Sequence, residues 1–207
     1  MMHGMPETRE IETLYPKVLQ YAPGCPEPTA IEHLRDAAVQ LCKSTRCWRD
    51  MDEFETDGLG PEEIPGIQPY AALFEIEKAW YNDHELERKG FGYDMLFHDA
   101  GEPRYITQVG PNSVMLDPAG AGTLKISMFL MPSENAETLP LFFFDQFPRA
   151  LADGALGTLL LLPNQPFTNP QLGVVFANKF QAVLDRNFAF NMRGQQRARK
   201  RTKPNYF

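Results

Sequence analysis

Apolar residues recur at helical spacing in the first quarter of the chain. The first such pattern predicts a helix over about 7–21, with Pro16 either kinking it or delaying its start. A linker rich in proline and glycine, residues 22–28, separates it from a second helix that ends near Arg46. Thr29 and Glu32 form a Thr-x-x-Glu capping box, which predicts where the second helix begins. Its apolar face consists of Ile31, Leu34, Ala38, Leu41, Cys42 and Thr45.

The C-terminal half carries two further helical patterns. Residues 149–162 are apolar nearly all round, with Asp153 as the only charge after residue 150, so we expect this helix to be buried. Ala150, Gly154 and Gly157 form a stripe of small residues that lets another backbone come close. Pro148 either kinks a helix begun near Pro140 or lies in a first turn capped by Asp145.

Asn169 followed by Pro170 predicts the start of the last helix, because proline is favoured at the first helical position. The predicted apolar stripe of that helix is Leu172, Val175, Phe176, Phe180, Val183, Leu184 and Phe188.

The middle of the chain shows strand-like patterns. We predict strands over 70–80, 84–88, 104–109, 113–116 and 123–131, with a turn at Asn82-Asp83. Residues 48–66 are acidic and broken by glycine and proline, and no element is assigned there. The fold class expected is α+β: an antiparallel bundle of about four helices, a small inserted antiparallel β region and an extended C-terminal tail. The predicted domains are 1–58 with 133–192 for the bundle, 59–132 for the insertion and 193–207 for the arm.

Charge is unevenly distributed along the 207 residues, whose net charge is −7. Residues 193–203 contain six of the 20 basic residues and no acid, which leaves 14 basic against 27 acidic residues elsewhere. An acidic body with a basic tail predicts a tail that docks on a negative partner. The longest apolar run is far too short to cross a bilayer and no signal segment opens the chain, so we expect a cytoplasmic protein without a membrane partner.

Residues able to carry chemistry are present, but no catalytic motif organises them. There is no phosphate-binding loop, His-Glu-x-x-His motif or nucleophile elbow. His84 and His98 could hold a metal with Asp83 or Asp99, yet lone surface histidines fit this spacing better. We therefore expect no catalytic residue, no metal, no cofactor and no enzyme.

Two acidic pairs and three cysteines complete the candidate chemistry. Glu75 and Glu77 would share one face of a strand, which makes them a better acid–base pair than Glu62 and Glu63. The cysteines, Cys25, Cys42 and Cys47, match no ligand or redox spacing. We expect Cys42 to be a small core residue and no disulfide to form.

Aromatic and basic residues point to interfaces. Three consecutive phenylalanines, Phe142, Phe143 and Phe144, cannot all face one core, so we predict that at least one meets a second surface. Trp80 is a further subunit-interface candidate, because aromatic residues are enriched in interfaces. In the tail, the proposed partner-binding residues are Arg193, Arg197, Arg199, Lys200, Arg201, Lys203, Tyr206 and Phe207. The tail can also be read as a solvated terminus or as a phosphate-binding segment.

The order of these motifs resembles the head-to-tail adaptor (connector) proteins of tailed bacteriophages, particularly short-tailed ones. The resemblance covers roughly 10–50 and 137–192. It is carried by Val18-Leu19, Tyr21-Ala22-Pro23-Gly24-Cys25-Pro26, Ile31 to Trp48, Leu139-Pro140, Gly154-Ala155-Leu156, Leu161-Leu162-Pro163, Pro166-Phe167 and Asn169-Pro170. The β region and the tail match no motif of that family.

The resemblance implies a structural virion protein at the head-to-tail junction, made in the host cytoplasm. Such adaptors form a ring, usually of twelve copies, that binds the portal protein and a tail or nozzle protein. Genomic DNA passes through the ring without sequence-specific contact, and the C-terminal arm commonly reaches the portal. The alternative is a nucleic-acid-binding module that uses the basic tail, although the acidic balance elsewhere and the lack of a recognition motif argue against it.

Overall fold

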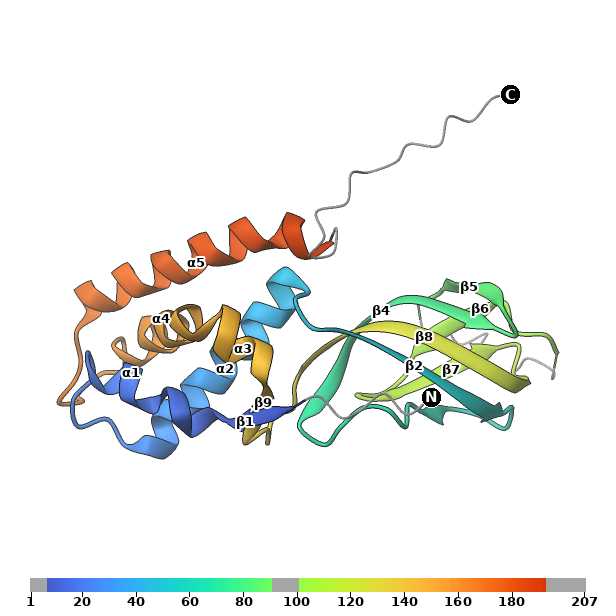
Figure 1. Cartoon of the computed structure of the whole chain (residues 1–207), viewed down its shortest axis with the longest axis horizontal. Coiled ribbons are helices and arrows are strands. Elements are labelled where there is room, and N and C mark those ends of the chain that lie inside the picture. The colour runs from blue at the N-terminus through green and yellow to red at the C-terminus, as the bar shows by residue number, and fades with distance from the viewer. Residues whose placement is uncertain (1–6, 91–100, 193–207) are drawn as a thin grey trace, which may run out of the picture. The chain divides into compact units, whose positions relative to one another are not determined.

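The computed structural model describes residues 7–90 and 101–192, with side chains as far as Asn187. The chain divides into two compact units (Figure 1). The helical unit is built from the residues up to Cys47 together with those from Glu137 onward, and the sheet unit spans Trp48–Ala136. The chain therefore enters the sheet unit earlier, and leaves it later, than the predicted boundaries at 58/59 and 132/133.

The helical unit combines helices with a two-stranded ribbon in which β1 pairs antiparallel with β9. Its elements in chain order are β1 (Thr8–Glu10), the 3-10 helix η1 (Ile11–Leu14), α1 (Tyr15–Leu19), α2 (Glu27–Thr45), β9 (Thr138–Pro140), α3 (Leu141–Gln146), α4 (Pro148–Leu159) and α5 (Pro170–Met192). Helices α2 and α5 both pack against α4, whose side chains are mostly buried.

The first two predicted helices begin differently from expectation. A helix over 7–21 is wrong: Pro16 lies in the first turn of the five-residue α1, where its missing N–H matters little, and β1 and η1 precede it. The capping box at Thr29 is also wrong, because α2 starts at Glu27 after Pro26 and no side chain caps it. Pro28 lies in the first turn of α2, where its fixed φ suits the helix and its missing N–H leaves no helical hydrogen bond unmade.

The C-terminal helices follow the predicted pattern more closely. Helix α3 ends at Gln146 and α4 begins at Pro148, with the non-helical Phe147 between them. Pro148 therefore starts a new helix and does not kink an existing one. The predicted start of α5 is confirmed: Asn169 Oδ1 accepts a hydrogen bond from the Leu172 N–H at 3.1 Å, and Pro170 is the first helical residue. The small-residue stripe of α4 is confirmed as well, since a Cβ on Gly157 would lie 3.0 Å from the Ala177 backbone.

The sheet unit is a seven-stranded sheet in the order β2-β8-β4-β5-β6-β7-β3, antiparallel except between β5 and β6. Its strands are β2 (Arg49–Asp57), β3 (Glu62–Glu63), β4 (Ala71–Tyr81), β5 (His84–Arg88), β6 (Tyr105–Gln108), β7 (Ser113–Asp117) and β8 (Ala121–Pro132). Asn82 and Asp83 both have positive φ, at 46° and 67°, as the tight turn of the β4–β5 hairpin requires.

The sheet curls back on itself until it is nearly closed. The turn between β6 and β7 reaches the start of β4, where the Leu73 N–H donates to Pro111 O at 3.2 Å and to Asn112 Oδ1 at 3.0 Å. The side chains of Leu124, Ile126 and Met128, at alternate positions of β8, are fully buried within the sheet unit. The sheet is therefore a unit with its own core.

The predicted fold class is wrong. The chain is a mixed α and β structure in which the described residues form five α-helices and a nearly closed seven-stranded sheet, and no antiparallel bundle of four helices exists among them. The error has two physical sources: Pro16 shortens the first helix, and β2 forms from an acidic segment that the sequence left unassigned. Strand β2 pairs along its whole length with β8.

Candidate interaction surface

The first three turns of the outer side of α5 form an uncharged, exposed helix face, and this face ends at the exposed Asp185, which accepts a hydrogen bond from Gln181 Nε2 at 2.9 Å. We define the α5 outer face as Gln171, Val174, Val175, Asn178, Gln181 and Ala182, which share one side of the helix and are all exposed. The opposite side carries Phe176, Phe180 and Leu184, which are buried. In Figure 1, α5 runs as the outermost long helix beside α4 and α2 within its unit.

Two valines make this face unusual for a solvated helix. Val174 is 53% exposed and Val175 is 47% exposed, although the sequence placed Val175 on the buried stripe. Between Pro170 and Leu184 the only charged residue is Lys179, and its Nζ lies 4.9 Å from the centre of the Phe176 ring, away from the outer face. The cores of protein interfaces are depleted in charge in this way.

The aromatic interface candidates separate into two groups. Phe143 and Phe144 are buried inside the helical unit, so they belong to its core. Phe142 is half-buried and stacks on Phe143, with ring centres 4.2 Å apart. Trp80 is half-buried in the sheet unit, where Lys78 Nζ lies 5.8 Å from its ring centre. Of the four aromatic candidates, Phe142 and Trp80 are thus the two whose side chains remain partly exposed.

The remaining interface candidates, Arg193 to Phe207, lie outside the described residues, as do His98 and Asp99.

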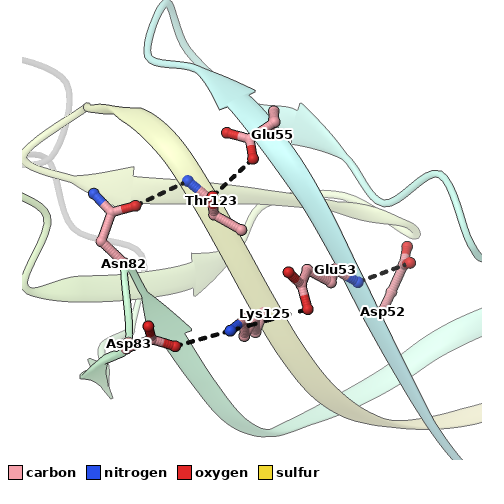
Figure 2. A network of polar contacts seen from close by, with 7 residues as sticks. All are labelled: Asp52, Glu53, Glu55, Asn82, Asp83, Thr123 and Lys125. Carbon is pink, nitrogen blue, oxygen red and sulfur yellow. Dashed lines mark hydrogen bonds and ion pairs between the residues drawn. The ribbon is translucent and has the colours of Figure 1, made fainter. Parts of the chain in front are cut away.

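The sheet unit presents an acidic, ion-paired face (Figure 2). Lys125 of β8 lies between two carboxylates: its Nζ is 2.8 Å from Asp83 Oδ1 and 4.0 Å from Glu53 Oε2. The hydrogen bond from Lys125 lowers the pKa of Asp83, and the same contact raises the pKa of Lys125. Beside them, Thr123 Oγ1 donates to Glu55 Oε1 at 2.7 Å. Such exposed pairs order the surface and contribute little free energy.

Strand β2 is an edge strand whose outward N–H groups are capped by carboxylates. The Met51 N–H donates to Asp50 Oδ1 at 2.8 Å. Figure 2 shows the second such bond, in which the Glu53 N–H donates to Asp52 Oδ1 at 2.9 Å. The Asp57 N–H donates to Glu62 Oε1 at 2.9 Å. These bonds, together with the negative charge, protect the edge against pairing with another strand. Assembly through strand addition is therefore disfavoured at this edge.

Glu75 and Glu77, the candidate acid–base pair, are separated by a bulge in β4 and bound to different cations. Glu75 Oε1 lies 3.4 Å from Arg88 Nη1. Glu77 accepts two hydrogen-bonding contacts from Arg49, each 2.8 Å long, and a third from Ser127 Oγ at 2.8 Å. Both carboxylates therefore act in surface ion pairs in this structure.

His84 is exposed, and no group of three or more His, Cys, Asp or Glu residues within 7–90 and 101–192 could hold a metal ion. None of the described helices is both long and apolar enough to cross a membrane.

A basic cleft in the helical unit is a site that sequence reasoning missed. It measures about 630 Å³ and is lined by Lys17 of α1, Arg149 and Asp153 of α4, and Lys179 of α5. Burial raises the pKa of Asp153, against the opposing effect of Lys179 and Arg149. The three basic residues are far apart in sequence, so no local sequence motif predicts that they lie together. They could bind a small anion or a phosphate group.

Comparison with known proteins adds no family to this picture. No protein-family model matches the sequence, and no curated protein matches it either.

Proposed function

We propose that this chain is a structural subunit of the head-to-tail junction of a tailed bacteriophage, assembling with its own copies into a ring around the DNA channel. The observation that carries the proposal is the α5 outer face, three helical turns of exposed and uncharged surface on an acidic protein. Copies of a molecule with net charge −7 repel one another, and that repulsion is weakest where a contact contains no charge.

The order of elements also supports the proposal. Both ends of the chain contribute to one helical unit, and the sheet unit is inserted between them. This order agrees with a helical body carrying a β insertion, which the resemblance to adaptor proteins implies. The carboxylates of the sheet unit add a further argument, because a negative surface facing a channel would keep passing DNA from adhering.

In this proposal the basic segment 193–207 is the arm that docks on the portal protein, with the aromatic Tyr206 and Phe207 as anchors. The test compares the full chain with a chain truncated after Met192. Both should remain folded, and only the full chain should co-sediment with portal rings of the phage that encodes it. Equal co-sedimentation of the two would overturn the docking role.

The basic cleft favours a second candidate function, nucleic-acid binding. Lys17, Arg149 and Lys179 could contact phosphates there. A duplex oligonucleotide would then bind with an affinity that falls steeply as salt increases, because phosphate contacts release counterions. Fluorescence anisotropy between low and physiological salt distinguishes this candidate from the structural one, which predicts no duplex binding at physiological salt.

A further inference from the structure

The end of α2 brings two cysteine sulfurs together. Cys42 Sγ and Cys47 Sγ lie 4.0 Å apart, and both thiols are free. In a continuous helix, residues five apart lie about 140° apart around the axis and about 7.5 Å apart along it, so they would not meet. Arg46 ends the helix in the left-handed conformation, with φ 50° and ψ 40°, and its N–H donates to Cys42 O at 2.8 Å. This change in chain direction brings the Cys47 side chain back beside the Cys42 side chain.

The two thiols differ in access and in acidity. Cys42 is fully buried, and burial raises its pKa. Cys47 is only half-buried, and hydrogen bonds from Cys42 and Thr45 lower its pKa despite the opposing effect of burial. A lower pKa means more thiolate at neutral pH, and the thiolate is the reactive form. Cys47 is therefore the sulfur that an external reagent meets first.

We propose that Cys47 and Cys42 form a thiol–disulfide modification site for a low-molecular-weight disulfide such as oxidised glutathione. The Cys47 thiolate attacks one sulfur of the reagent, whose sulfur–sulfur bond breaks and releases one glutathione thiolate. The Cys42 sulfur then attacks the Cys47 sulfur, which releases the second glutathione as a thiolate, and that thiolate takes up the proton that Cys42 loses. The protein dithiol loses two electrons, and the reagent gains them.

Closing the bond requires the sulfurs to approach from 4.0 Å to about 2 Å. Cys42 lies in the last turn of α2 and Cys47 lies two residues beyond its end, so the approach requires only local movement of the residues that end the helix. The chain passes from the helical unit to the sheet unit directly after Cys47. A disulfide would therefore restrain residues 42–47, directly before the chain enters the sheet unit. This inference does not depend on the proposed function.

The test treats the full chain with oxidised glutathione, blocks remaining thiols with N-ethylmaleimide and digests it with trypsin. Trypsin cuts after Arg35, Lys43, Arg46 and Arg49, so the disulfide appears as Asp36–Lys43 joined to Cys47–Arg49 without the intervening tripeptide. We expect this linked pair, and blocked thiols per chain falling from three to one. Three blocked thiols after full exposure to the reagent would overturn the proposal.

Single substitutions assign the two roles. Cys42→Ser should retain one glutathione on Cys47, because no second sulfur can release it, whereas Cys47→Ser should carry none. Cys25→Ser is the matched control: Cys25 is buried and burial raises its pKa, so its replacement should leave the linked peptides unchanged. A Cys42→Ser protein without adduct, or an adduct equally abundant on Cys25, would contradict the proposal.

Discussion

Gly157 of α4 lies against the backbone of Ala177 of α5, so close that an added Cβ would stand 3.0 Å from both Ala177 Cα and Ala177 N. A backbone cannot move aside as a flexible side chain can. The close approach of these two helices holds α5 in place, with its apolar stripe inward and the α5 outer face toward solvent. The stability of this contact is therefore tied to the proposed assembly surface.

Gly157→Ala should destabilise the helical unit by about 1 kcal/mol or more, because overpacking against a backbone outweighs the gain of about 1 kcal/mol in helix propensity. Urea unfolding followed by circular dichroism measures this change. Gly60→Ala is the control, since nothing lies within 4 Å of the added Cβ. A Gly157→Ala protein as stable as the control would show that the helices can separate without cost.

Asp153→Asn should raise the free energy of unfolding at pH 7 by roughly 0.5 kcal/mol or less, the usual scale for half-exposed positions. Burial raises the pKa of Asp153 above its ordinary value of 3.8, so ionisation costs more in the folded state. The wild type therefore loses stability as pH rises from 3.8 through the folded pKa. The advantage of Asp153→Asn should shrink as pH falls toward 3.8, and an advantage that grows at low pH would contradict this account.

Lys125→Met should raise the pKa of Asp83, because it removes the hydrogen bond that lowers it. Carboxyl NMR titration should give a midpoint below 3.8 in the wild type and a higher one in the variant. The ion pair stabilises the folded state above the unfolded pKa, and that contribution disappears as pH falls through the folded pKa. High salt should reduce the difference between the two proteins. Identical midpoints at low salt would show that the pair does not persist in solution.

The sequence predicted the elements with strong local patterns and missed those that depend on distant partners. Strands β4 to β8 and helices α2, α4 and α5 were predicted near their observed positions. Strand β2 was not predicted, because its residues are mostly acidic and only Thr56 among them is buried. It forms by pairing with β8, whose partner residues are 64 positions away in the sequence at Asp57↔Ala121 and 80 positions away at Arg49↔Phe129.

The candidate surface was only partly predictable for a similar reason. Val175 and Phe176 are neighbours at the border of the apolar stripe, and only the position of α4 decides which of them is buried. The basic cleft joins residues from three helices, so it requires the tertiary fold. Phe143 and Phe144 resemble interface residues in sequence, but α3 packs them into the core of the helical unit.

Val174→Glu should weaken self-association at least tenfold without changing the fold, because it places a negative charge in the proposed contact between acidic copies. Sedimentation velocity over a range of protein concentrations measures the change. Leu59→Glu is the matched control, since Leu59 is an apolar residue 88% exposed in a loop of the sheet unit. If both substitutions weaken self-association equally, the change in net charge explains the effect, and the α5 outer face is not the contact surface between copies.

The most direct test of the structural role is native mass spectrometry of the full chain, alone and mixed with portal rings of the encoding phage. The account predicts that copies join the portal in one fixed ring stoichiometry and that Val174→Glu lowers its occupancy. A chain that remains monomeric in the presence of portal, but is retained on duplex DNA at physiological salt, would contradict it.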